Sequence, residues 1–383
     1  MLSCQKSRFS LPDDEHYLNC AYMSPISVAV ETAGMTGVAR KRVPSRIATS
    51  DFFTESDRAR ALFARLVNAP DPSRVAIIPA ASYGLAIAAR NLPAGAGQNI
   101  VVTHEQFPAN VHAWRRLARD RGVEIRVVAP PAVVEGRGRG WNTRLLEAID
   151  TSTAIVALGH VHWTDGTKFD LEAIGRRARE VGAALVVDGT QSVGAMPFDV
   201  QAIQPDALVC ATYKWLMGPY SMGFAYLGPR FDTGEPLEET WIGRAGSENF
   251  KELVNYRDDY QPGAMRYDVG ERTNFALMPM AIAALEQVLE WQPARVQEYC
   301  AALTADLFDR VRALGYTVET PEYRGAHLFG LRAPAGTDIT AVGERLRARS
   351  VLVSLRGSAL RVSPHVYNDA RDIDALLAAL SAV

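Results

Sequence analysis

The chain has 383 residues, 48% of them hydrophobic, and its acidic and basic residues balance to a formal net charge of −2. This length predicts two domains, or one large α/β domain with an appendage, and the balanced charge argues against a nucleic-acid-binding protein. The four scattered cysteines form no CxxC pair, which fits a reducing cytoplasm. We expect neither a signal peptide nor a membrane span, because no run of 18 apolar residues occurs.

Short apolar runs alternate with amphipathic helical patterns from about residue 50 to residue 230. Near-continuous apolar strands separated by helices predict a mostly parallel sheet that helices cover on both faces. The last two strands are joined by a short loop, so we expect one of them to run antiparallel. The predicted strands lie at 75–80, 99–104, 124–130, 153–161, 184–190, 207–212 and 221–228.

The chain changes character after residue 228. Residues 229–277 are polar and weakly periodic, which predicts a long surface excursion of a kind that is often functional. Helical patterns then return with three short strands, so the rest of the chain is expected to form an α+β domain. Upstream, the glycine-rich stretch 136–140 is predicted to be a loop or hairpin, not a nucleotide-binding turn.

Charged side chains follow two neighbouring strands of the predicted sheet, where ligands of open α/β sheets bind. Asp188 ends one strand, and Lys214 follows the next. A buried carboxylate and a buried ammonium each need a partner, so one interpretation pairs the two as a salt bridge. The other gives each a ligand: Lys214 forms a Schiff base with an aldehyde cofactor, and Asp188 faces its protonated pyridine nitrogen. We favour the second interpretation, with pyridoxal 5′-phosphate as the cofactor.

Other strand ends carry weaker signals. Ser82 follows the first strand and is either a helix N-cap or part of a phosphate-binding turn. Phe107 follows the second strand and is either a hydrophobic staple or a ring that stacks on a planar ligand. His160 and His162 have a spacing found in metal sites, but no third ligand accompanies them, so we expect no metal.

Two motifs, VVDGTQSVGA at 186–195 and ATYKWLMGP at 211–219, carry a family resemblance. The chain resembles the class V aminotransferase branch of fold-type I pyridoxal phosphate enzymes, which includes cysteine desulfurases, kynureninases and isopenicillin N epimerase-like proteins. The resemblance runs from about residue 17 to residue 374. It implies an α/β fold of the fold-type I PLP-transferase kind, with a mostly parallel seven-stranded sheet sandwiched by helices and a smaller α+β C-terminal domain. It divides the chain into an N-terminal arm that packs with the small domain (1–45), a large cofactor-binding domain (46–277) and a small domain (278–383).

The resemblance also implies roles at the cofactor ring. Lys214 matches the Schiff-base lysine, and Asp188 matches the acid at the pyridine nitrogen. Gln191 matches the amide near the phenolic oxygen, and Phe107 matches the ring-stacking position. Trp163 stands near the ring, where desulfurases usually have a polar residue and kynureninase-like members often have an aromatic one.

Further roles concern the phosphate and the substrate. Ala81 and Ser82 match the phosphate-binding turn, and Tyr213 matches the residue before the lysine that touches the phosphate. Arg361 matches the arginine that binds the α-carboxylate, and its planar guanidinium suits that group. Arg356 is a second candidate for substrate binding.

The segment 270–274 resembles one that reaches the phosphate of a neighbouring subunit, with Thr273 as the contact residue. The resemblance therefore implies a homodimer with its active sites at the interface. The segment 355–361 is short and has no cysteine, which disfavours the desulfurase reaction through a persulfide on the protein.

The resulting expectation is a cytoplasmic enzyme, similar to class V aminotransferases, that acts on the α-carbon or β-substituent of a small amino acid. Transamination, a C–S or C–C lyase reaction and epimerisation remain open. A relative that binds the cofactor without catalysis is the third alternative.

Overall fold

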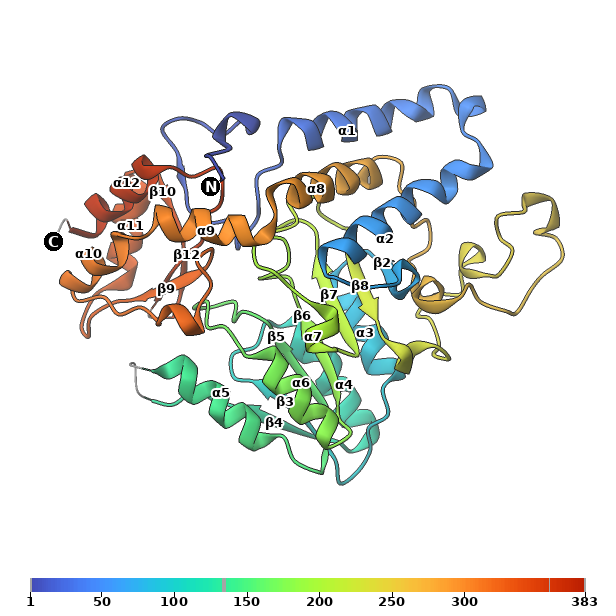
Figure 1. Cartoon of the computed structure of the whole chain (residues 1–383), viewed down its shortest axis with the longest axis horizontal. Helices are drawn as coiled ribbons and strands as arrows, with labels where there is room; N and C mark the ends of the chain where they lie inside the picture. Colours follow the sequence, from blue (N-terminus) through green and yellow to red (C-terminus); the bar gives the residue numbers. More distant parts are fainter. Residues whose placement is uncertain (1, 133–135, 358, 382–383) are drawn as a thin grey trace.

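A seven-stranded sheet forms the centre of the computed structural model, which describes residues 2–132, 136–357 and 359–381 (Figure 1). The strand order is β2-β8-β7-β6-β5-β3-β4. β8 runs antiparallel to both β7 and β2, while the other neighbours are parallel, as expected from the sequence. The strands are β2 (Val75–Ile78), β3 (Asn99–Thr103), β4 (Glu124–Val128), β5 (Thr153–Gly159), β6 (Ala184–Asp188), β7 (Ala207–Ala211) and β8 (Gly223–Leu227).

Helices cover both faces of this sheet, which explains its continuous apolar strands. Along β2, Val75 and Ile77 face one buried cluster, whereas Ala76 and Ile78 face the other. One face packs against α3 (Ala81–Asn91) and α4 (Ala109–Arg121). The opposite face packs against α2 (Thr54–Leu66), α5 (Arg137–Ala148), α6 (Leu171–Glu180), α7 (Val200–Ile203) and α8 (Leu277–Trp291).

A smaller unit follows α8 and has its own core. Its antiparallel sheet has the order β11-β12-β9, and Phe329 and Leu360 are buried between this sheet and the surrounding helices. Together with the larger sheet, this confirms the predicted fold class. The unit comprises α9 (Pro293–Leu303), α10 (Leu307–Ala313), α11 (Ile339–Ala348), α12 (Ala370–Ser381), β9 (Phe329–Arg332), β10 (Val351–Leu352), β11 (Ser354–Arg356) and β12 (Ala359–Val362).

The N-terminal residues cross from one unit to the other. β1 (His16–Tyr17) pairs with β10 in the small unit, and α1 (Val28–Ala39) then packs along α8 (Figure 1). None of the helices in the described residues is both long and apolar enough to cross a lipid bilayer.

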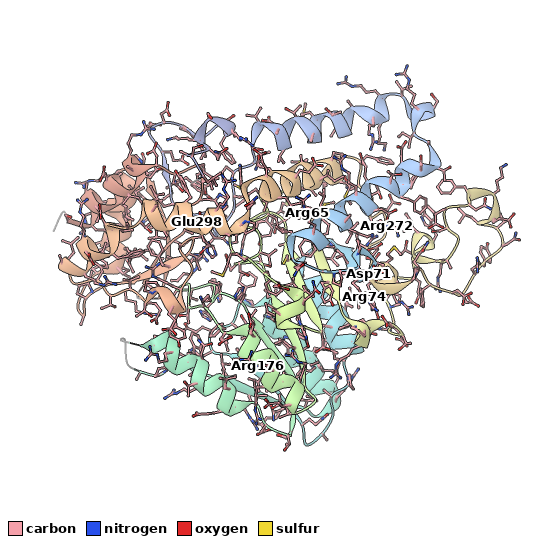
Figure 2. All side chains as sticks on the ribbon, viewed as in Figure 1. Arg65, Asp71, Arg74, Arg176, Arg272 and Glu298 are labelled. Atoms are coloured by element: carbon pink, nitrogen blue, oxygen red, sulfur yellow. The ribbon has the colours of Figure 1, made fainter. Side chains whose placement is uncertain are left out.

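A buried charge cluster ties the segment after residue 262 to the sheet. Asp268 is 1% exposed and accepts hydrogen bonds from Arg60 of α2, from Arg272 and from the backbone N–H of Ile77. Arg60 also donates to the carbonyl of Val75. Figure 2 labels Arg272, which lies beside α2 in that view. Two guanidinium groups therefore share one carboxylate inside the protein.

Candidate active site

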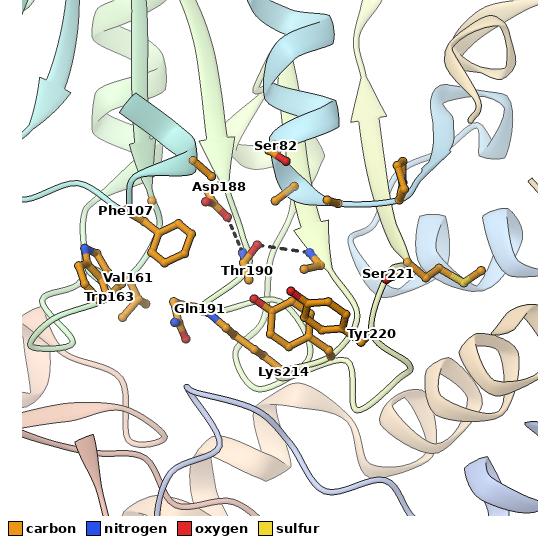
Figure 3. A pocket seen from close by; sticks show the side chains of 18 of the residues that line it. Ser82, Phe107, Val161, Trp163, Asp188, Thr190, Gln191, Lys214, Tyr220 and Ser221 are labelled. Atoms are coloured by element: carbon orange, nitrogen blue, oxygen red, sulfur yellow. Dashed lines mark hydrogen bonds between the residues drawn. The ribbon is translucent and has the colours of Figure 1, made fainter. Parts of the chain in front are cut away.

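A cavity of about 280 Å³ lies at the carboxyl ends of the parallel strands, where open α/β sheets bind ligands (Figure 3). The structure brings most of the predicted cofactor residues to its wall, although they come from five separate segments. The predicted residues that line it are Ala81, Ser82, Phe107, Trp163, Asp188, Gln191, Tyr213 and Lys214.

Lys214 lies in the loop after β7 and is 6% exposed. Its Nζ lies 5.4 Å from the ring centroid of Phe107 and 5.5 Å from that of Tyr213. No carboxylate in the described residues forms an ion pair with it, so the salt bridge to Asp188 that the sequence left open is not formed. Burial and the positive charge of Arg361 lower the pKa of Lys214 to about 8. The amine is therefore partly neutral near physiological pH and available to react.

Asp188 ends β6 and is 9% exposed. Its carboxylate accepts a hydrogen bond of 3.0 Å from the backbone N–H of Thr190, whose Oγ1 in turn accepts one from Ala211 (Figure 3). Burial raises the pKa of Asp188, and no cation in the described residues pairs with it. A protonated ring nitrogen beside this carboxylate would supply the missing positive charge. Sequence reasoning missed Thr190, although its place two residues after a strand-ending aspartate is a signal for such a bond.

The first turn of α3 forms another part of the wall. Ala80 is its N-cap and provides no side-chain hydrogen bond, so Ser82 is not the N-cap and the helix amides remain available to an anion. A Cβ on Gly84 would lie 2.6 Å from Cγ1 of Val209, so this glycine allows α3 to approach β7 closely. The positive end of α3 is thereby held at the cavity.

Aromatic side chains form the wall opposite α3. The rings of Phe107 and Trp163 meet edge to face, with centroids 5.4 Å apart. The indole N–H of Trp163 donates to the carbonyl of Glu105. Gln106, which sequence reasoning missed, also lines the cavity, and its buried Nε2 has no hydrogen-bond partner within the described residues.

The two predicted substrate arginines lie behind Trp163 instead of lining the cavity. Nη1 of Arg361 donates to the carbonyl of Trp163 at 2.8 Å, and the guanidinium of Arg356 lies 5.2 Å from the centre of the Trp163 ring. Arg361 is 1% exposed, and burial lowers its pKa to about 9. Thr273 lies in a separate hollow beside α1, where its hydroxyl donates to the carbonyl of Phe52.

Residues 16–24, here called the N-terminal strap, connect the small unit to the cavity. The N–H of Ala21 donates to Oγ of Ser363, while its carbonyl accepts from Nε2 of Gln191. Farther along the strap, the N–H of Ser24 donates to the carbonyl of Tyr213, next to Lys214. The strap therefore supports both predicted cofactor loops.

The loop after Lys214 contributes residues that sequence reasoning did not single out. Tyr220 and Ser221 line the cavity, and the tyrosine ring packs against Tyr213 at 4.8 Å (Figure 3). Ser221 has a φ of 65°, a left-handed conformation that is uncommon for a residue with a side chain. In the sequence, the Gly218-Pro219 turn just before Tyr220 and Ser221 was the signal that could have pointed to this loop.

The side chains of His160 and His162 do not face a common site. His162 is hydrogen-bonded to Thr164 and to the carbonyl of His104, whereas His160 lines a different hollow. Burial lowers the pKa of His160 to about 3. Within the described residues, no group of three His, Cys, Asp or Glu side chains could hold a metal ion.

This cavity suits a flat ring with a positive charge at one edge and a phosphate at another. The carboxylate of Asp188, which pairs with no cation in the described residues, matches the positive edge of such a ring. The uncapped N-terminus of α3 matches the phosphate, and Lys214 offers an amine between aromatic rings. On a mostly parallel seven-stranded sheet, these features define a pyridoxal phosphate protein of fold-type I.

Comparison with known proteins identifies the family. The model of the family described as Aminotransferase class-V matches residues 41–376, and the chain therefore belongs to that family of pyridoxal phosphate enzymes. This confirms the family, the cofactor and the general activity on amino acids that the sequence predicted.

Relatives of several kinds cover most of the chain. An uncharacterized protein of Schizosaccharomyces pombe is 26% identical over 93% of this chain and 81% of its own length. The isopenicillin N epimerase of Streptomyces clavuligerus is 25% identical over 85% of this chain and 84% of its own. The structure of a cysteine desulfurase from Thermococcus onnurineus superposes with a TM-score of 0.84 at 19% identity, over 99% of this chain and 97% of the other. The desulfurase structure shares the fold of this chain, and the epimerase and the desulfurase are named for different reactions.

Proposed function

We propose that this enzyme removes the α-proton of an amino acid and that Lys214 both attaches the cofactor and acts as the base. The observation that carries the proposal is the state of Lys214, which is 6% exposed at the cavity wall and has a pKa lowered to about 8 without an ion pair. A general base works best when its pKa lies near the operating pH. The amine also lies beside aromatic rings that keep the site dry.

The other cavity residues are proposed to hold the cofactor. Pyridoxal phosphate, when bound, supplies a ring that accepts the electron pair left on the α-carbon. Asp188 keeps the ring nitrogen protonated, because a buried carboxylate is stabilised by an adjacent positive charge. Phe107 contacts the face of the ring, and the amides of Ala81 and Ser82 hold the phosphate.

The remaining predicted residues complete this proposal. Gln191 lies near the phenolic oxygen, Tyr213 contacts the phosphate and Trp163 lies near the ring. Arg361 binds the α-carboxylate, because a guanidinium makes two parallel hydrogen bonds to such a group.

Transamination is the outcome we propose first, with elimination and epimerisation as alternatives. The isopenicillin N epimerase and the cysteine desulfurase among the relatives represent the two alternatives. Persulfide chemistry on the protein is disfavoured, because no cysteine of the described residues lines the cavity. Burial also raises the pKa of Cys20 to about 12.

Proton exchange in deuterated water tests the proposal whatever the final reaction. The cofactor-loaded enzyme is incubated with both enantiomers of the common amino acids, with and without a 2-oxo acid, and the α-proton signal is followed by NMR. We expect exchange with at least one amino acid. Turnover that requires a 2-oxo acid indicates transamination, ammonia release without one indicates elimination, and inversion indicates epimerisation. No exchange with any amino acid, despite bound cofactor, would favour the non-catalytic alternative.

The pH dependence of cofactor attachment tests Lys214 directly. Only the neutral amine is a nucleophile, so the rate at which Lys214 attaches pyridoxal phosphate is expected to rise with pH and level off above about pH 8. With the ordinary lysine pKa of 10.5, the rate would keep rising to pH 10. Stopped-flow absorbance after mixing cofactor-free protein with the cofactor measures this profile. A rate that still climbs steeply from pH 9 to pH 10 contradicts the assignment.

We also propose a homodimer in which Thr273 reaches the cofactor phosphate of the partner subunit. In its own chain, Thr273 lines a hollow with Val38 and Trp241, which are 61% and 40% exposed. Such exposed apolar side chains favour an interface over open solvent. Light scattering is expected to give twice the mass of the chain, and a monomer at micromolar concentration would contradict the dimer.

The proposed division of the chain follows the sequence prediction, with an arm at 1–45, a large domain at 46–277 and a small domain at 278–383, whose first helix, α8, packs on the large sheet. The pairing of β1 with β10 supports the packing of the arm on the small domain. Limited proteolysis that first cut elsewhere than near these boundaries would argue against this division.

A cytoplasmic location is also proposed, since the four cysteines are free. Recovery from a secreted fraction would contradict it.

A further inference from the structure

Two cationic side chains lie on the same face of the hairpin formed by β11 and β12. Arg361 pairs directly opposite Ser354, and Arg356 follows Ser354 by two residues on the same strand. Since side chains alternate along a strand, Arg356 and Arg361 are diagonal neighbours on one face. Leu355 and Leu360 point to the other face, where they pack into the core of the small unit.

Both arginines contact Trp163, a residue that lines the cavity. Arg361 binds its carbonyl, and Arg356 lies over its ring, so both guanidinium groups adjoin the residue that forms this part of the wall. Both are close enough to Lys214 to lower its pKa, and Arg361 has the larger effect.

The two charges have no counterpart in the described residues. Neither arginine forms an ion pair with a carboxylate there, and the Nε of each is buried without a hydrogen-bond partner. Arg361 donates only to Trp163 and Ser354, and Arg356 donates to the carbonyl of Leu355. Burying a guanidinium without a counter-ion is unfavourable. The α-carboxylate of an amino-acid substrate would neutralise only one of the two arginines.

We propose that the substrate is an amino acid with a second carboxylate on its side chain, which Arg356 binds while Arg361 binds the α-carboxylate. This inference rests on the proposed function, because it assumes that an amino acid reacts at Lys214. A planar guanidinium recognises a carboxylate through two parallel hydrogen bonds. Arg361, which is buried beside the carbonyl of Trp163, takes the carboxylate next to the reacting carbon, and Arg356, which lies over the Trp163 ring, takes the terminal one. Trp163 contacts both arginines and lines the cavity beside them.

The test compares diacids with their neutral amides. Aspartate, glutamate and 2-aminoadipate of both configurations, with asparagine and glutamine as matched amides, are incubated with the cofactor-loaded enzyme in deuterated water. We expect kcat/KM for α-proton exchange to be about 10- to 100-fold higher for the preferred diacid than for its amide, the range that a hydrogen bond to a charged group provides. Arg356→Gln should abolish this preference by lowering kcat/KM for the diacids to the value of the amides, whereas the exposed control Arg347→Gln should keep both values. Arg361→Gln should instead weaken exchange with diacids and amides alike.

Binding of unreactive acids gives a second measurement that does not depend on turnover. Calorimetry on the cofactor-loaded protein should show that glutarate binds about 10-fold more tightly than butyrate and that Arg356→Gln removes the difference. Arg347→Gln, at an exposed position in α11, serves as the matched control and should preserve it. If Arg356→Gln does not fold, Arg356→Lys keeps the charge and should show a partial loss of the preference.

The outcomes separate the inference from the function on which it rests. Exchange that is equal for diacids and amides, or a diacid preference that survives in Arg356→Gln, overturns the inference and leaves the proposed function standing. The absence of exchange with every amino acid overturns the proposed function itself.

Discussion

Replacing Lys214 with alanine is expected to lower turnover by about 10³-fold or more. A positioned general base contributes about 10²- to 10⁴-fold, and here the same amine also attaches the cofactor. Because Lys214 is buried without an ion pair, its removal should leave the free energy of unfolding unchanged or slightly increased. The measurements are α-proton exchange, the visible spectrum with added pyridoxal phosphate, and mass spectrometry after borohydride reduction.

Lys251→Ala is the matched control, since Lys251 is exposed in a segment remote from the cavity. It should retain both turnover and the borohydride-fixed cofactor. If the Lys214→Ala variant kept its turnover, or if borohydride still fixed the cofactor to the protein at full yield, another amine would have to be the reactive one.

Replacing Asp268 with alanine is expected to cause a large loss of stability. This carboxylate is 1% exposed and accepts hydrogen bonds from Arg60 and Arg272. Its loss would leave Arg272 buried without an ion pair and Arg60 with only a 3.6 Å contact to the largely exposed Asp57. Breaking a buried ion pair from one side costs about 3–5 kcal/mol, and here two cations lose the same partner. Urea unfolding, monitored by circular dichroism at constant protein concentration, measures the change.

Asp258→Ala provides the comparison, because Asp258 is exposed and its side chain forms no ion pair in the described residues. Its unfolding midpoint should match that of the original protein. A loss below about 1 kcal/mol in Asp268→Ala would mean that water or a rearranged side chain reaches the two arginines.

The residues at the strand ends could be predicted because a parallel sheet gathers them. Asp188 and Lys214 each follow an apolar strand, and parallel neighbours end at the same edge. The place of Arg361 behind Trp163 could not be predicted in this way. It depends on how the small unit packs on the large one, and this packing has no periodic signal in the sequence.

One local prediction was wrong. The stretch 136–140 was expected to be a loop or hairpin, but residues 137–140 form the first turn of α5, although glycine disfavours helices. A Cβ on Gly138 would lie 2.5 Å from Cβ of Tyr323, and one on Gly140 would lie 2.8 Å from Cγ of Pro131. Close approach to these neighbours explains the glycines, and such contacts are visible only in three dimensions.

The N-terminal strap also bears on how the protein is made. Its hydrogen bond between Ala21 and Ser363 joins residues 342 positions apart, so the strap cannot be anchored to the small unit before residue 363 has been synthesised. Contacts of such long range form late, after more local structure has closed most of the loop between them. In a shorter nascent chain, the strap that bonds to Gln191 and Tyr213 therefore lacks its anchor on the small unit. A chain interrupted before β12 would carry Lys214 beside a strap that has no contact with the small unit's Ser363.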